Sequence, residues 1–144
     1  MSVYFEKKVS LELIKLFLIY VFNIKEDEVK IFEQNYFFEN GYLEVDDHIK
    51  CLCTYRYLTG DVNLIIDLYR IEDQSPKIMI ERVKSFFLCN NWDGFIIVEN
   101  IDDDYLKIGN SLIQSVRIND DLIEDDKLTK ITKHAKRHFW LNDV

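Results

Sequence analysis

The residues of this chain best suited to hold a metal are its cysteines and a nearby histidine. Cys51 and Cys53 are separated by one residue, and His48 and Cys89 could complete a set of four zinc ligands. Structural zinc sites usually have spacers of two or more residues between paired cysteines, and these lie on turns. A one-residue spacer within a strand points both thiols to one face, which is typical of core cysteines. We therefore expect no metal site, and reduced thiols as in cytosolic proteins.

A second pair of metal-ligand types, His134 and His138, is separated by four positions. On a helix this spacing places both imidazoles on one face. The zinc motif with this spacing needs glutamate directly after the first histidine, and Ala135 stands there instead. The neighbouring Lys133 and Lys136 would also repel a cation. We interpret this segment as a basic, solvated helix.

Carboxylates cluster in the second half of the chain, where they could bind Mg²⁺ or a basic partner. The clusters are Asp102, Asp103, Asp104, Asp120, Asp121, Glu124, Asp125 and Asp126. Their offsets do not match a calcium-binding loop, which needs a glycine and a closing glutamate. The tripeptide Glu28-Val29-Lys30 has the spacing of one nuclease class, but no Pro-Asp precedes it. A metal-dependent nuclease therefore remains a minor alternative.

Other catalytic and cofactor motifs are missing from the sequence. It contains no glycine-rich phosphate loop, no G-x-S-x-G elbow and no dinucleotide fingerprint, and it has only four glycines. A catalytic set assembled by residues distant in the sequence stays open. We expect neither catalysis nor a cofactor.

The composition favours one folded, acidic domain. Of the 144 residues, 48% are hydrophobic and 14% aromatic, which is enough for a core and argues against disorder. The net charge of −8 disfavours nucleic acid and anionic membranes as partners, and it speeds encounter with a basic partner. The basic stretch from Lys127 to Arg137 could contact phosphates. Acidic residues precede it, however, and this is the charge order that a helix favours.

An apolar stretch near the amino terminus raises the question of export. Lys7-Lys8 and residues 11–22 resemble a short signal peptide, but Lys15 interrupts the apolar run and no small-residue cleavage site follows. The run is also shorter than the roughly 20 residues that a membrane span requires. We expect a cytoplasmic protein.

The longest β pattern, from His48 to Ile71, predicts two strands joined by a turn at Gly60-Asp61. The resulting pairs are Tyr57 with Leu64, Tyr55 with Ile66 and Cys53 with Leu68 on an apolar face, and Arg56 with Ile65 and Thr54 with Asp67 on a mixed face. A hairpin of this kind needs a cover. The helix expected at 11–22, with Ser10 as N-cap, is apolar on nearly every side and is predicted to be buried against the apolar face.

The remaining elements complete an α+β pattern. We predict a strand at 3–5, a strand at 29–38 leading into 42–45 (with a helix as the alternative), a helix from Ser75-Pro76 to Leu88 with Met79, Val83, Phe86 and Phe87 on one side, a strand at 95–99, a hairpin of 105–108 and 112–118, and a last helix at 127–141. Strands are grouped with strands, and helices lie before, between and after them. The fold class is therefore α+β, with a largely antiparallel sheet and about three helices in a single domain.

Acidic stretches beside aromatic residues carry a resemblance to a functional class. Asp102–Asp104 and Asp120–Asp126 accompany Trp92 and Tyr105 on a small chain rich in Ile, Lys, Asn and Asp. Such a chain resembles the immunity proteins that protect bacteria from their own toxins, such as those of contact-dependent inhibition systems. The resemblance implies a stoichiometric binder that blocks a basic toxin domain, often a nuclease. Cognate pairs of this class rest on electrostatic steering and a few buried anchors.

These considerations define the expected contact residues. The acidic stretches are predicted to provide carboxylates for a cognate basic toxin, and Trp92 and Tyr105 to provide anchors. The alternatives are a general interaction or regulatory domain, including a homodimer formed through exposed aromatic residues, and then the metal-dependent nuclease. The sequence leaves the oligomeric state open.

Overall fold

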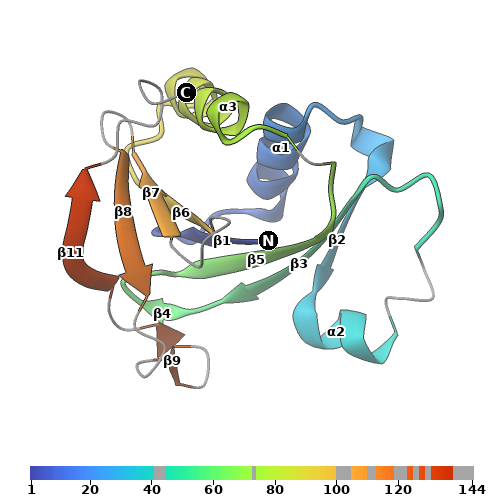
Figure 1. Ribbon diagram of the computed structural model, residues 1–144. Coiled ribbons are helices and arrows are strands. Elements are labelled where there is room, and N and C mark those ends of the chain that lie inside the picture. Colours follow the sequence, from blue (N-terminus) through green and yellow to red (C-terminus); the bar gives the residue numbers. More distant parts are fainter. Residues whose placement is uncertain are drawn as a thin grey trace.

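The fold is α+β, as predicted, and is built on one large, mostly antiparallel sheet (Figure 1). The computed structural model describes residues 1–40, 45–72, 74–99, 105–109, 113–118, 123–124, 127–128 and 131–137, with side chains up to residue 116. In chain order the elements are β1 (Ser2–Phe5), α1 (Leu11–Phe22), the 3-10 helix η1 (Glu26–Glu28), β2 (Val29–Glu33), α2 (Gln34–Glu39), β3 (Cys51–Tyr57), β4 (Thr59–Gly60), β5 (Leu64–Arg70), α3 (Pro76–Cys89), β6 (Ile96–Glu99), β7 (Tyr105–Ile108), β8 (Ile113–Ile118), β9 (Ile123–Glu124), β10 (Lys127–Leu128) and β11 (Ile131–Arg137).

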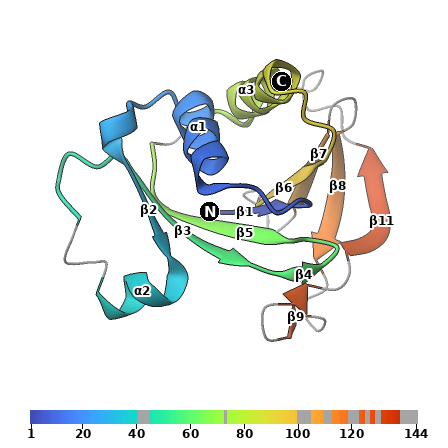
Figure 2. The same ribbon diagram turned by 180° about the vertical axis from the view of Figure 1, so that it is seen from behind.

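The order of strands brings the two ends of the chain into one sheet. Eight strands follow the order β11-β8-β7-β6-β1-β5-β3-β2, and all neighbours are antiparallel except β2 and β3, which are parallel. A small second sheet contains β4, β10 and β9. Both views place α1 and α3 on one side of the large sheet and α2 below β2 and β3 (Figures 1 and 2). We call the side under α1 and α3 the first face, and the opposite side the second face.

The predicted hairpin of β3 and β5 is confirmed in both register and faces. Tyr57 lies opposite Leu64 and Tyr55 opposite Ile66, as the turn geometry required. Gly60 has a φ of 112°, which glycine adopts without the steric cost that a side chain would impose. The inward side chains of the hairpin belong to the main core on the first face.

Helix α1 has the predicted bounds, and its start and end have local causes. The hydroxyl of Ser10 accepts a hydrogen bond from the backbone N–H of Leu13, and Asn23 ends the helix in the left-handed region. Its buried residues are Ile14, Phe17, Leu18 and Val21. The expectation of burial on nearly every side was too strong, because Leu16 and Tyr20 point away from the core and are 54% and 44% exposed.

Helix α3 also starts where the sequence predicts. Ser75 accepts a hydrogen bond from the N–H of Ile78, and Pro76 occupies the first turn, where its missing N–H costs nothing. The buried side of the helix is Ile80, Val83, Phe86 and Phe87. The Phe17 ring lies 5.4 Å from that of Phe86, edge to face, so α1 and α3 pack on each other as well as on the sheet.

The predicted strand at 29–38 is correct only for its first half. Strand β2 ends at Glu33, and α2 follows directly. The Glu33 carboxylate accepts a hydrogen bond from the N–H of Tyr36 and so caps the helix start. The helical turn brings the rings of Tyr36 and Phe37 back over Phe32, at 6.1 and 5.7 Å. Most of the strand predicted at 42–45 lies outside the described residues.

The predicted helix at 127–141 is wrong for the part that the structure describes. Residues 127–128 and 131–137 are strands, and β11 pairs antiparallel with β8. Pairing gives the N–H and C=O groups of β8 partners that a separate helix could not supply. A lysine-rich strand with a register shift between Thr132 and Lys136 also suits a sheet edge, since charges and bulges discourage further pairing. The helical face predicted for His134 therefore does not form, and His138 lies outside the described residues.

The length and hydropathy of the helices bear on membrane insertion. Within the described ranges, no helix combines the length and apolar character needed to cross a membrane. The longest, α3, has 14 residues.

Truncation of the hairpin core should be strongly destabilising. Leu64 and Ile66 are fully buried beneath α1, so Leu64→Ala or Ile66→Ala should lower the free energy of unfolding by about 2–5 kcal/mol. Urea unfolding followed by circular dichroism measures the change. Leu16→Ala is the matched control, because that leucine is largely exposed, and it should change stability by less than about 0.5 kcal/mol. Equal losses in the core and control variants would contradict this packing.

Candidate interaction surface

A row of side chains crosses the second face of the sheet from β7 to β2. Strand register places them side by side in the order Tyr105, Glu99, Ser2, Asp67, Thr54 and Phe32. All of them point away from α1 and α3, because side chains alternate between the two faces along a strand. We call the first five of these residues the polar row.

The central part of the polar row is fixed by Ser2. Its hydroxyl donates a hydrogen bond to Oδ1 of Asp67 at 2.5 Å, and its backbone N–H donates to Oε2 of Glu99 at 3.0 Å. Two carboxylates from different strands are thereby held on either side of one small residue. The neighbouring Thr54 is 1% exposed, and its hydroxyl oxygen has no hydrogen-bond partner among the described residues. The row therefore presents negative charge on a rigid sheet.

One end of this face carries a group of rings that we call the α2 aromatic cluster. Its members are Phe32, Tyr36, Phe37, Phe38 and Tyr69. The ring of Phe37 stacks on that of Tyr69, with centroids 5.7 Å apart and an interplanar angle of 23°. Phe38, Tyr69 and Tyr36 are 59%, 51% and 44% exposed. Exposed aromatic residues grouped in this way mark interaction sites more often than isolated ones do.

The segment that carries this cluster is acidic. Between Lys30 and Lys50 the sequence contains no lysine or arginine. It contains the acidic residues Glu33, Glu39, Glu44, Asp46 and Asp47. Glu33 lies directly before α2 and Glu39 is its last residue, and both are exposed, so two carboxylates lie on the segment that carries the rings. The combination favours a partner with cationic side chains.

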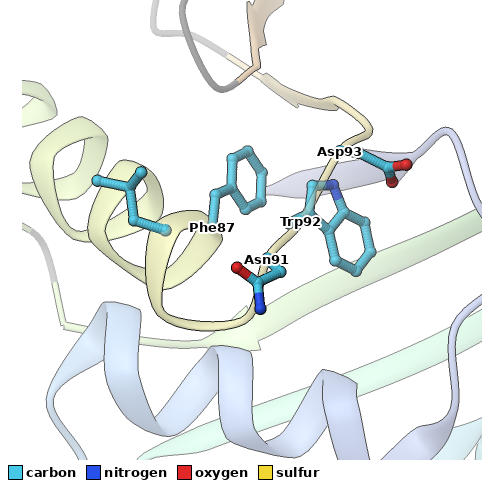
Figure 3. A pocket seen from close by; sticks show the side chains of 5 residues that line it. Phe87, Asn91, Trp92 and Asp93 are labelled. Carbon is cyan, nitrogen blue, oxygen red and sulfur yellow. The ribbon is translucent and has the colours of Figure 1, made fainter.

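Trp92 lines a pocket beside the end of α3 (Figure 3). The pocket has a volume of about 240 Å³ and is lined by Phe87, Leu88, Asn91, Trp92 and Asp93. Trp92 is only 8% exposed, and its indole stacks on the Phe87 ring at 5.6 Å. A Cβ at Gly94 would lie 2.9 Å from Oε2 of Glu6 and 3.1 Å from Nε1 of Trp92, so these two side chains would have to shift to admit one. Trp92 is a core residue, and we leave it out of the interaction surface.

A second pocket, of about 460 Å³, lies where the β1–α1 connection meets the hairpin turn. It is lined by Glu6, Gly60, Asp61, Asn63, Phe95 and Lys107. The Glu6 carboxylate accepts a hydrogen bond from the N–H of Phe95 at 3.1 Å, and the Asn63 amide donates to the Glu6 carbonyl. The ammonium of Lys107 lies 4.0 Å above the Phe95 ring. These contacts connect Glu6, Asn63, Phe95 and Lys107, which come from four different segments of the chain.

The structure separates the two anchors that the sequence predicted. Trp92 belongs to the main core on the first face, whereas Tyr105 is half-buried on the second face, with its ring 5.8 Å from that of Tyr4. Because they lie on opposite faces of the sheet, Trp92 and Tyr105 cannot both contact a partner that binds at one surface. Tyr105 does lie at the far end of the polar row. Of the acidic residues predicted as contacts, Glu124 lies in β9, and its side chain is outside the described part.

The other predicted contacts, Asp102–Asp104, Asp120, Asp121, Asp125 and Asp126, lie outside the residues that the structure describes. Their role stays a prediction. The α2 aromatic cluster was not predicted, because the aromatic residues of 29–38 favoured one continuous strand. The spacing of Phe32, Tyr36 and Phe37, together with Glu33 as a possible cap, could have indicated a helical turn.

The cysteines and histidine considered as metal ligands are dispersed. Cys51 and Cys53 are buried in the main core, while Cys89 and His48 are exposed. Across the described ranges, no group of three or more His, Cys, Asp or Glu residues is placed to hold a metal ion. Burial raises the pKa of the Cys51 thiol to about 12. Burial, and secondarily the neighbouring Cys51 and Asp67, raises the pKa of Cys53.

Comparison with other proteins adds no further constraint. The chain matches no protein-family model, no curated protein and no solved structure. Exposed rings beside fixed carboxylates can bind a cationic side chain by stacking and ion pairing together.

The buried thiols predict how stability changes at alkaline pH. The pKa of Cys51 is raised from 9.0 to about 12, so above pH 9 the unfolded chain loses a proton that the folded protein keeps. Ionisation of this thiol should not change the free energy of unfolding below about pH 8. Above about pH 9 it should lower the free energy of unfolding by up to roughly 1.4 kcal/mol per pH unit. Urea unfolding measured across this range should show a shallower fall for Cys51→Ala. Cys89→Ala is the control because its thiol is exposed, and an equal reduction of the slope there would contradict the assignment.

Proposed function

We propose that the protein is a non-catalytic immunity protein that binds and neutralises a cognate basic bacterial toxin. A nuclease domain is the toxin class that the resemblance implies, and the proposal places the protein in the cytoplasm. The observation that carries it is the exposed α2 aromatic cluster, bordered by carboxylates, on a chain of net charge −8. Neutralisation in this proposal is steric and electrostatic, so it needs no catalytic group.

The two features of the surface would act at different stages of binding. The acidic chain attracts a cationic domain over a distance of about 8–10 Å at physiological salt and raises the encounter rate. Aromatic side chains then exclude water and determine how long the complex lasts. A nuclease must expose a basic substrate site to bind phosphates. An acidic, aromatic surface is complementary to such a site and would occlude it.

A second candidate function is a homodimeric interaction domain, and different residues favour it. Leu16 on α1 and Leu88 on α3 are 54% and 73% exposed, on the helical layer that covers the first face. Exposed leucines of this kind suit contact between two copies of the chain. Sedimentation at several protein concentrations separates the two functions. A stable dimer disrupted by Leu88→Ser would favour the homodimer.

The nuclease alternative depends on Glu28, whose carboxylate has structural partners. It accepts a hydrogen bond from the N–H of Lys25 at 3.3 Å and lies 3.7 Å from the ammonium of Lys50. These contacts hold η1 at the entry to β2. A chelator-sensitive nuclease activity abolished by Glu28→Ala, with folding intact, would revive this alternative.

The proposal predicts protection against a toxin encoded next to this protein. Co-expression with the product of the neighbouring reading frame should rescue growth, and the two chains should co-purify in equal amounts. Asp→Asn changes at Asp102–Asp104 and at Asp120–Asp126, made separately, should each weaken binding, more at low salt than at high salt. Circular dichroism controls for folding. Full protection with both stretches neutralised would exclude these carboxylates as contacts, and absence of binding to the toxin would exclude the function.

A further inference from the structure

We propose that the α2 aromatic cluster is a docking surface for an arginine-bearing segment of a basic protein partner. The proposal deepens the proposed function, and it rests on that function for the identity of the partner. It differs from the contacts inferred from the sequence, since it lies wholly on described residues of the second face. It commits to one chemistry, a guanidinium placed against rings and between carboxylates.

The rings form a platform that is ordered before any partner arrives. Phe32 is 8% exposed on β2 and supports both Tyr36 and Phe37. Phe37 is half-buried and stacks on Tyr69, which is supplied by β5. The cluster therefore joins a helix and two strands. A partner gains contact with fixed rings, and little conformational entropy is lost on binding.

The charges around the platform select a cation. Asp67 points to the second face, and Tyr69, two positions further along the same strand, stacks on Phe37 there. Glu33 caps the start of α2, where its carboxylate accepts a hydrogen bond from the N–H of Tyr36, and Glu39 is the last residue of the helix. Three cations lie on the strands around it. Lys30 is exposed on β2, Arg56 points to the second face from β3, and Arg70 donates hydrogen bonds to the carbonyls of the loop before β3.

Arginine fits this surface better than lysine does. Its guanidinium is planar and weakly hydrated, so it can stack on a tyrosine ring while donating in-plane hydrogen bonds to a carboxylate. The lysine ammonium is compact and strongly hydrated, and it gains less from a ring that is open to water. A purely apolar segment would leave the bordering carboxylates without partners. The surface should therefore discriminate between two cations of equal charge.

The test uses the full-length protein and short synthetic peptides in which arginine, lysine or glutamate alternates with glycine. Fluorescence anisotropy at low salt measures their affinities. The arginine peptide should bind more tightly than the lysine peptide, and the glutamate peptide should not bind. Removing one ring, in Tyr69→Ala or Tyr36→Ala, should weaken binding of the arginine peptide by about two- to fivefold.

Tyr20→Ala is the matched control for Tyr36→Ala. Both tyrosines are 44% exposed and both have a phenylalanine ring about 6 Å away, but Tyr20 lies on α1, above the first face. Affinity for the arginine peptide should be unchanged in Tyr20→Ala. Equal losses in the two variants, or equal binding of arginine and lysine peptides, would overturn the proposal. So would a dimer of the native chain that Phe38→Ala dissociates, because a second copy would then occupy the surface.

The toxin experiment separates failure of this inference from failure of the function. If the toxin binds with the same affinity after Tyr36→Ala and Tyr69→Ala, the function stands and the docking surface is wrong. If the arginine peptide binds at this surface but no neighbouring toxin does, the docking surface stands and the immunity function is wrong. Loss of toxin binding in both variants, with Tyr20→Ala unaffected, supports the two together.

Discussion

The pairing of β1 with both β5 and β6 is the constraint on which the rest of the structure depends. This four-residue strand joins the β2-β3-β5 part of the sheet to the β6-β7-β8 part, although its two neighbours begin about 60 and 90 residues further along the chain. It also links the two faces. Phe5 packs its ring against Phe17 and Trp92 on the first face, and Ser2 holds Asp67 and Glu99 on the second. Loss of β1 pairing would separate the halves of the sheet and release both carboxylates at once.

The two faces of the large sheet differ in how much apolar surface they bury. The first face is closed by α1 and α3 and contains most of the buried apolar side chains, so it accounts for most of the stability. The second face has a smaller core around Tyr4, Ile65 and Ile97, and the rings of Tyr36, Phe38 and Tyr69 are exposed on the same side of the sheet. Under the proposed function, the contact residues on strands are held by the sheet and need no reorganisation on binding. Stability and recognition can then change independently, since substitutions at exposed rings leave the main core intact.

The parts of the fold that could be predicted have local causes. Ser10 and Ser75-Pro76 define helix starts through their own hydrogen bonds and geometry, and Gly60 defines the register of a whole hairpin through one turn. The wrong predictions concern segments whose structure depends on residues that are distant in the sequence. Residues 131–137 become a strand because β8 provides an edge, and residues 34–39 turn into a helix because Phe32 provides a surface for their rings. Trp92 was chosen as an anchor for its type, but its burial depends on Phe5 and Phe87, which only the fold brings to it.

The location of α2 explains why an acidic protein would place exposed rings at this corner. β2 is the last strand of the large sheet and pairs in parallel with β3, whereas the only other parallel pair among the described strands is the short β4–β10 contact. The chain must therefore run back along the sheet between β2 and β3. That connection is long, and α2 begins it on the second face, where α1 and α3 do not compete for space. A crossover of this kind tolerates side chains that the core would reject. Rings and carboxylates can therefore accumulate there for binding, supported by a sheet whose stability does not depend on them.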